Sequence, residues 1–87
     1  MTVIISDRAE RDFAAQIRWL NENSPRAGKR AASRIIYMLD LLEDYPNLGV
    51  ELTRTLREKH VRFGRDGFVI RYSRRAGDVI VHRIFHT

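Results

Sequence analysis

The sequence predicts one small α+β domain, residues 1–87, made of an N-terminal strand, an antiparallel helical hairpin and a three-stranded antiparallel meander. Two consecutive segments carry apolar residues at helical spacing and are separated only by a short Asn-Ser-Pro joint, which is typical of a helical hairpin. Three later segments are rich in apolar residues and are separated by glycine-containing turns, which is typical of a meander. Because 87 residues bury only one modest core, we expect the hairpin to cover one face of the sheet.

The first strand is expected at residues 3–5, where Val-Ile-Ile forms a short apolar run. A helix is predicted over 8–22, with Asp7 as its N-cap and Glu10 completing a capping box three residues later. The apolar residues at helical spacing that mark its buried face are Ala9, Phe13, Ile17 and Leu20.

A second helix is predicted over 25–45. Ser24 can cap it, and Pro25 suits its first turn, where no backbone N–H is needed. It should end near Tyr45, because Pro46 disfavours helical geometry in the residue before it. Its expected buried face consists of Ala27, Ala31, Ile35, Met38 and Leu42, with Leu39 beside it.

The meander begins after a turn at 46–49. Strands are predicted at 56–63, 68–72 and 78–86, joined by a hairpin connection at 64–67 and a turn at Ala76 and Gly77. In the central strand Phe68, Ile70 and Tyr72 share one face, while Val69, Arg71 and Ser73 share the other. Regular alternation in the last strand places His82 and His86 on one face, and the sequence leaves open which face the helices cover.

The positive charge is concentrated in the second half of the chain. Residues 1–51 carry seven Lys or Arg and eight Asp or Glu, whereas residues 52–87 carry nine and three, so the second half holds the whole excess. Such asymmetry indicates a polyanion or an acidic protein as partner, and a merely solvated surface is the alternative. The side chains expected to contact a target or nucleic acid are Arg57, Lys59, His60, Arg62, Arg71, Arg74, Arg75 and Arg83.

The second helix has an unusual order of charges. Lys29, Arg30 and Arg34 lie in its N-terminal half and acidic residues lie in its C-terminal half, which opposes the helix macrodipole. Either the basic half binds a partner, or its cations form ion pairs with the first helix.

Motifs of known enzyme classes and metal sites are missing from the sequence. It has no cysteine, no His-Glu-x-x-His helix, no nucleophile elbow and no phosphate-binding glycine loop, so no metal or cofactor is expected. Metal-free RNA cleavage needs only cations to stabilise the phosphorane and one group to move a proton, for which His86 is the candidate. No signal peptide or membrane-spanning run is recognisable, so a cytoplasmic protein is expected.

Nearly the whole chain resembles toxins of the RelE/ParE superfamily from type II toxin–antitoxin systems. The resemblance rests on the element order and on three stretches: "NSPRAGKRAASRI" at 23–35, "LLEDYPNLG" at 41–49 and "GFVIRYSRRAGDVIVHRIFH" at 67–86. It implies a cognate antitoxin, acidic and partly disordered, that folds on binding across the helices and sheet. Lys29, Arg30 and Arg34 are the expected antitoxin-binding residues.

The resemblance is closer to ParE-like than to RelE-like members. RNA-cleaving members usually carry Arg where this chain has Val69, and the opening of the second helix and the "RIFH" ending at 83–86 look more like ParE. This implies a toxin that inhibits DNA gyrase. The alternative is a RelE-like ribosome-dependent endoribonuclease, in which Arg62, Arg71 and Arg83 would hold the phosphate and His86 would be the acid or base. ParE-like members usually continue into a short basic tail, which this sequence does not include. A third interpretation is a basic binding module, or an inactive relative, that is not toxic when expressed alone.

Overall fold

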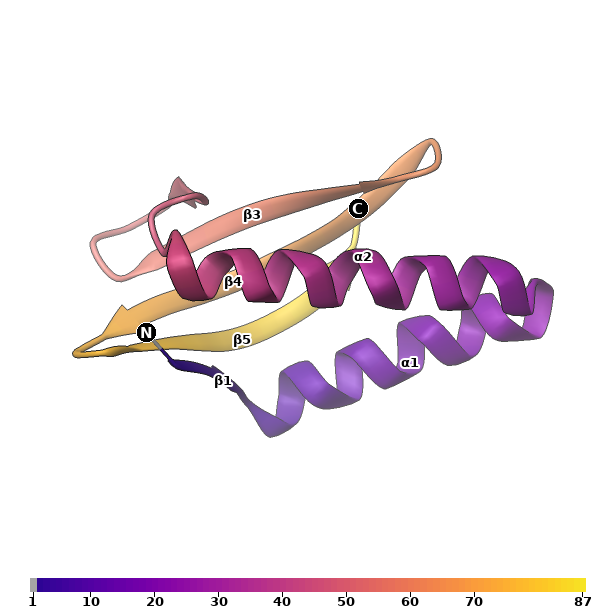
Figure 1. Cartoon of the computed structure of the whole chain (residues 1–87), viewed down its shortest axis with the longest axis horizontal. Helices are drawn as coiled ribbons and strands as arrows, with labels where there is room; N and C mark the ends of the chain where they lie inside the picture. The colour runs from indigo at the N-terminus through magenta and orange to yellow at the C-terminus, as the bar shows by residue number, and fades with distance from the viewer. Residues whose placement is uncertain (1) are drawn as a thin grey trace.

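The computed structural model describes residues 2–87 as a five-stranded sheet with two helices on one face (Figure 1). The elements are β1 (Thr2–Ile5), α1 (Asp7–Asn23), α2 (Pro25–Asp44), β2 (Val50–Glu51), β3 (Leu56–Phe63), β4 (Asp66–Arg75) and β5 (Asp78–His86). The spatial order of the strands is β1-β5-β4-β3-β2, with β1 parallel to β5 and the other pairs antiparallel. The predicted α+β class and element order are confirmed. The two-residue strand β2 was not predicted. Neither helix within residues 2–87 combines the length and the apolar character that a membrane span requires.

Each helix is capped at its N-terminus by a serine. Ser24 Oγ accepts a hydrogen bond from the backbone N–H of Ala27 at 3.2 Å, as predicted for α2. The prediction of Asp7 as the N-cap of α1 is wrong, because Ser6 Oγ accepts from the backbone N–H of Ala9 at 3.1 Å. Ser6 is held extended at the end of β1, where its N–H bonds to the carbonyl of Val81 at 3.0 Å. The helix therefore starts one residue earlier than predicted, with Asp7 in its first turn.

The central strand presents Phe68, Ile70 and Tyr72 to the helices, and all three are buried. The other core residues are Ala9, Ala31, Ile35, Leu39, Leu42, Val61, Val79, Val81 and Ile84. Val69 is also buried although it lies on the opposite, helix-free face, where its cross-strand neighbours are His60 and Phe85. We call this helix-free side the open face.

A β-bulge in β5 breaks the predicted alternation of its side chains. Arg71 pairs with Arg83 and Tyr72 pairs with Val81, which leaves His82 as an extra residue. Directly opposed residues share a face, so Val81, Ile84 and His86 lie on the helix side. His82 lies on the open face, where its Nε2 is 2.7 Å from Ser73 Oγ. The prediction that His82 and His86 share a face is therefore wrong.

Two tight turns complete the meander. The predicted connection at 64–67 is shorter in the structure, since Phe63 already pairs with Asp66 and only Gly64 and Arg65 join the strands. Gly64 has a φ of 62°, which glycine adopts without strain. Ala76, in the next turn, has a φ of 53°, a conformation that costs a residue with a Cβ roughly 1–2 kcal/mol.

Candidate partner-binding groove

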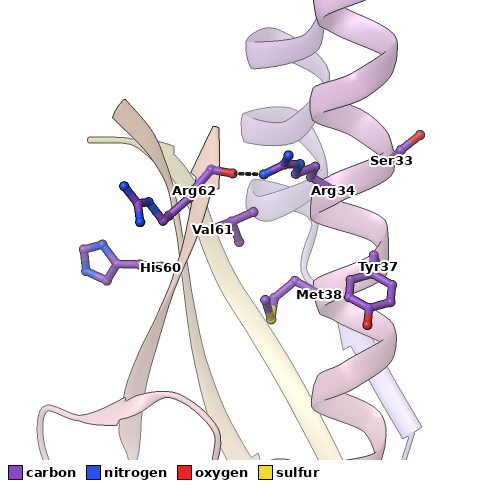
Figure 2. Close-up of a pocket in the computed structure, with 7 residues that line it drawn as sticks. All are labelled: Ser33, Arg34, Tyr37, Met38, His60, Val61 and Arg62. Atoms are coloured by element: carbon purple, nitrogen blue, oxygen red, sulfur yellow. Dashed lines mark hydrogen bonds between the residues drawn. The ribbon is translucent and has the colours of Figure 1, made fainter. Parts of the chain in front are cut away.

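A groove runs between α2 and the outer edge of β3 (Figure 2). Its volume is about 530 Å³, and its walls are formed by Ser33, Arg34, Tyr37, Met38, His60, Val61 and Arg62. Met38 and Val61 point toward each other in the space between helix and strand, while the side chains of His60 and Arg62 point away from α2. The groove therefore combines an apolar floor with a basic rim.

Tyr37 is the most exposed apolar side chain along the groove, with 63% of its surface accessible. It lies on α2 outside the buried stripe, so packing within the domain does not explain it. Large exposed aromatic residues beside a basic rim are typical of protein interfaces, where tyrosine and arginine are enriched. Arg34, His60 and Arg62, which the sequence indicated as binding residues, line the groove, whereas Tyr37 was missed although an aromatic residue outside the apolar stripe of a helix could have indicated it.

The β3 edge that borders the groove is open. β2 pairs only with Arg57 and Glu58, so residues 59–63 have no strand on that side. The carbonyl of Leu56 points away from β4, because it accepts a hydrogen bond from the N–H of Leu52 at 2.9 Å. Along a strand, the N–H and C=O groups of every second residue point to the same side. The backbone groups of His60 and Arg62 therefore also point into the groove. Arg34 donates to the carbonyl of Arg62 at 2.8 Å, which caps one of these groups.

The basic half of α2 is not neutralised by α1. Within residues 2–87 the ion pairs join Arg71 to Glu58 and Arg83 to Asp12, His86 Nε2 lies 4.0 Å from Asp66, and none of these contacts connects the two helices. Arg30 instead places its guanidinium 5.7 Å from the centre of the Phe63 ring, Arg34 borders the groove, and Lys29 is exposed. The alternative of ion pairs between the helices is thus wrong.

Two arginines meet on the open face of the sheet, and each is bound to a carboxylate of the same chain. Arg71 Nε donates to Glu58 Oε2 at 2.8 Å, and Arg83 Nε donates to Asp12 Oδ2 at 2.7 Å. Both guanidinium groups also lie over the ring of Phe85, at 5.1 and 5.9 Å from its centre. Their positive charge is thus largely compensated within the domain.

The Asp12 carboxylate anchors α1 to β5. Burial acts to raise its pKa, but the hydrogen bonds from Arg83 and from the backbone N–H of Ile84 outweigh burial, so the pKa is lowered. The same contact raises the pKa of Arg83. Only 16% of the Asp12 side chain is accessible. This ion pair is therefore a structural tie between residues 71 positions apart.

A match to a known protein family shows to which family this chain belongs. A model described as "ParE toxin of type II toxin-antitoxin system, parDE" matches residues 3–87. The chain belongs to the ParE toxin family. It is thus the toxin of a type II toxin–antitoxin system, and the resemblance to the RelE/ParE superfamily is confirmed.

Among the relatives of this ParE family toxin, some are named RelE and a solved structure is named ParDE. It is similar to "Toxin RelE1" of Caulobacter vibrioides, with 41% identity over 85 residues, covering 98% of this chain and 91% of the relative. It is 33% identical over 86 residues to "Toxin RelE3" of the same organism, covering 99% and 94%. Its fold matches a chain of a solved structure, "Chromosomal ParDE TA system from P. aeruginosa", with a TM-score of 0.77 and 16% identity, covering 100% and 96%.

The four residues predicted for RNA cleavage do not gather in one place in this ParE family toxin. Arg71 and Arg83 are cross-strand partners, and Arg62 lies on the same open face near the far end of β3. His86 lies on the helix side, with its ring 5.8 Å from that of Phe68 and its Nε2 4.0 Å from Asp66. The proton-transferring candidate and the phosphate-binding candidates thus face opposite sides of the sheet.

The wider set of basic residues predicted for target binding is also divided. His60, Arg62, Arg71 and Arg83 belong to the open face, whereas Arg57 and Lys59 alternate with them on the helix side of β3. Arg74 and Arg75 end β4, at the opposite end of the sheet from His86. In this ParE family toxin the sequence thus identified the basic residues, but not the separate surfaces that they form.

Proposed function

We propose that this toxin inhibits DNA gyrase in the cytoplasm and so blocks DNA replication, until a cognate antitoxin neutralises it. The observation that carries the proposal is the match of residues 3–87 to the ParE family. The arrangement of the basic residues supports it, because Arg71 and Arg83 are bound to Glu58 and Asp12 rather than free to hold a substrate phosphate.

Phosphodiester cleavage without a metal needs a proton-transferring group next to the cations that stabilise the phosphorane. His86 is separated from Arg71 by the thickness of the sheet. A toxin that acts by binding a protein has no need of that proximity. The geometry thus favours inhibition by binding over RNA cleavage.

The test is a supercoiling assay with purified toxin and gyrase, accompanied by pulse labelling after induction of the toxin in bacteria. We expect loss of supercoiling activity, and thymidine incorporation should fail before methionine incorporation. If supercoiling is untouched and protein synthesis stops first, the gyrase proposal is wrong.

The alternative is ribosome-dependent RNA cleavage, which the RelE names of the Caulobacter relatives favour. Under this alternative the double substitution Arg71→Ala and His86→Ala should abolish toxicity while the fold survives. Cleavage of messenger RNA on purified ribosomes is the direct readout. Toxicity that persists in the double variant would exclude this mechanism.

The groove between α2 and β3 is the proposed antitoxin site. An acidic antitoxin segment would find Lys29, Arg30 and Arg34 along α2, an apolar floor, and outward backbone groups at His60. An extended segment that orders on binding can use such an edge by adding a strand to the sheet. The charge order of α2, unfavourable for the helix alone, would then serve the complex.

A further inference from the structure

A second hollow lies at the end of the sheet away from His86, and its walls contain only polar side chains. It has a volume of about 200 Å³ and is formed by Asn47, Arg54, Thr55, Arg57 and Arg74. These residues come from the loop after α2, the loop before β3, and the adjoining ends of β3 and β4. Residues distant in the sequence thus bring three guanidinium groups around one cavity.

Neutral groups hold two of these arginines in place. Arg57 donates to the carbonyls of Gly49 at 2.8 Å and Asn47 at 3.4 Å, and Arg74 donates to Asn47 Oδ1 at 2.9 Å. Each of these bonds uses only one terminal nitrogen, NH1, of its guanidinium, so most of the five N–H donors of each group remain. Asn47 therefore orients both groups without compensating their charge.

The hollow differs in this respect from the open face. Within residues 2–87 the carboxylates of the ion pairs are Asp12 and Glu58, Asp66 lies beside His86, and none of the three contacts Arg54, Arg57 or Arg74 within ion-pair distance. Arg57 pairs with Tyr72 across the strands, which makes Arg74 its diagonal neighbour on the same face. Like charges placed this close repel each other, so an anion between them would relieve the repulsion.

The chemistry of the walls indicates which anion. Arginine, asparagine and threonine side chains are among the groups that contact phosphate oxygens in protein–nucleic acid complexes, and arginine can bind a phosphate through two N–H groups at once. The hollow offers no aromatic or aliphatic side chain of the kind that anchors a protein partner. Arg75 follows Arg74 in the chain and is exposed, which extends the positive charge beyond the cavity.

We propose that Arg54, Arg57 and Arg74 form a site for a phosphate group of a nucleic-acid backbone. The site lies apart from the antitoxin groove and from Arg71 and Arg83. It requires neither gyrase nor the ribosome to be the target, so it stands or falls separately from the proposed function. The phosphate would belong to DNA if gyrase is the target and to RNA if the ribosome is the target.

The test measures binding of short fluorescent duplex DNA, and of an RNA duplex of the same sequence, to the purified toxin at several salt concentrations. The variant carries Arg54→Gln and Arg74→Gln, which leaves Arg57 to support its loop. A matched control carries Arg11→Gln and Arg18→Gln, two exposed arginines of α1. Thermal melting checks that both variants fold.

We expect the variant of the hollow to weaken binding about tenfold at low salt and to reduce the slope of log Kd against log salt by about 1, as for one phosphate that is no longer neutralised. The control should change both quantities much less. Tighter binding of DNA or of RNA identifies the source of the phosphate. The proposal is overturned if the two variants weaken binding equally, or if polyglutamate displaces the nucleic acid as effectively as inorganic polyphosphate does.

Discussion

The hydroxyl of Tyr72 should be one of the most important polar atoms for the stability of the domain. Tyr72 is fully buried, and its hydroxyl donates to the carbonyl of Pro46 at 2.7 Å and accepts from the N–H of Gly49 at 2.9 Å. A single hydroxyl thereby satisfies both ends of the loop that follows α2. That loop carries Asn47 of the polar hollow and leads into β2.

Replacing Tyr72 with Phe keeps the ring and removes both bonds. The Gly49 N–H would be left buried without an acceptor, which costs about 1–3 kcal/mol, and the Pro46 carbonyl would lose a bond worth about 1 kcal/mol. We therefore expect the free energy of unfolding to fall by roughly 2–4 kcal/mol. For a domain of this size, each kcal/mol lowers Tm by roughly 4–8 °C.

Thermal and urea unfolding of Tyr72→Phe against the parent protein measures this loss. Tyr45→Phe is the matched control, because Tyr45 is 62% exposed and should change stability by less than about 0.5 kcal/mol. If Tyr72→Phe unfolds within that same margin of the parent, the two hydrogen bonds do not hold the loop, and the reasoning is wrong.

Three further predictions follow from other contacts. The Asp12 carboxylate contributes stability that is present above its unfolded pKa of about 3.9 and is lost as pH falls through the lowered folded pKa. Asp12→Asn should remove this contribution, so Tm of the variant should vary less across the acid range than Tm of the parent. Equal slopes of Tm against pH would contradict this. Ala76→Gly should stabilise the domain by about 0.5–1 kcal/mol in urea unfolding, because glycine adopts the positive φ without strain. The control Ala15→Gly, on the exposed side of α1, should destabilise the domain by about 1 kcal/mol, and the reverse order of stabilities would refute the argument. Arg34→Glu should slow antitoxin association in stopped-flow measurements at low salt more than Arg11→Glu does, and equal rates would exclude the groove as the landing site.

The sequence by itself determined the elements that depend on neighbouring residues. Ser24 and Pro25 predicted the start of α2, and the apolar spacing of both helices predicted their buried stripes, because capping and helical periodicity act over only a few residues. The basic character of the second half was also evident, as was the family resemblance carried by local stretches. These signals were enough for the α+β class and for a toxin of a type II system.

The tertiary structure decided which side chains meet. The bulge at His82 turns His86 to the helix side, and its position depends on the pairing of β5 with β4, which no local pattern in β5 shows. Ser6 rather than Asp7 caps α1, because β1 adds to the sheet beside Val81. Asp12 reaches Arg83 from 71 residues away, and so removes an apparently free cation from the open face. Such contacts depend on strand order, register and helix packing, and these are set by burial of the whole core rather than by any one segment.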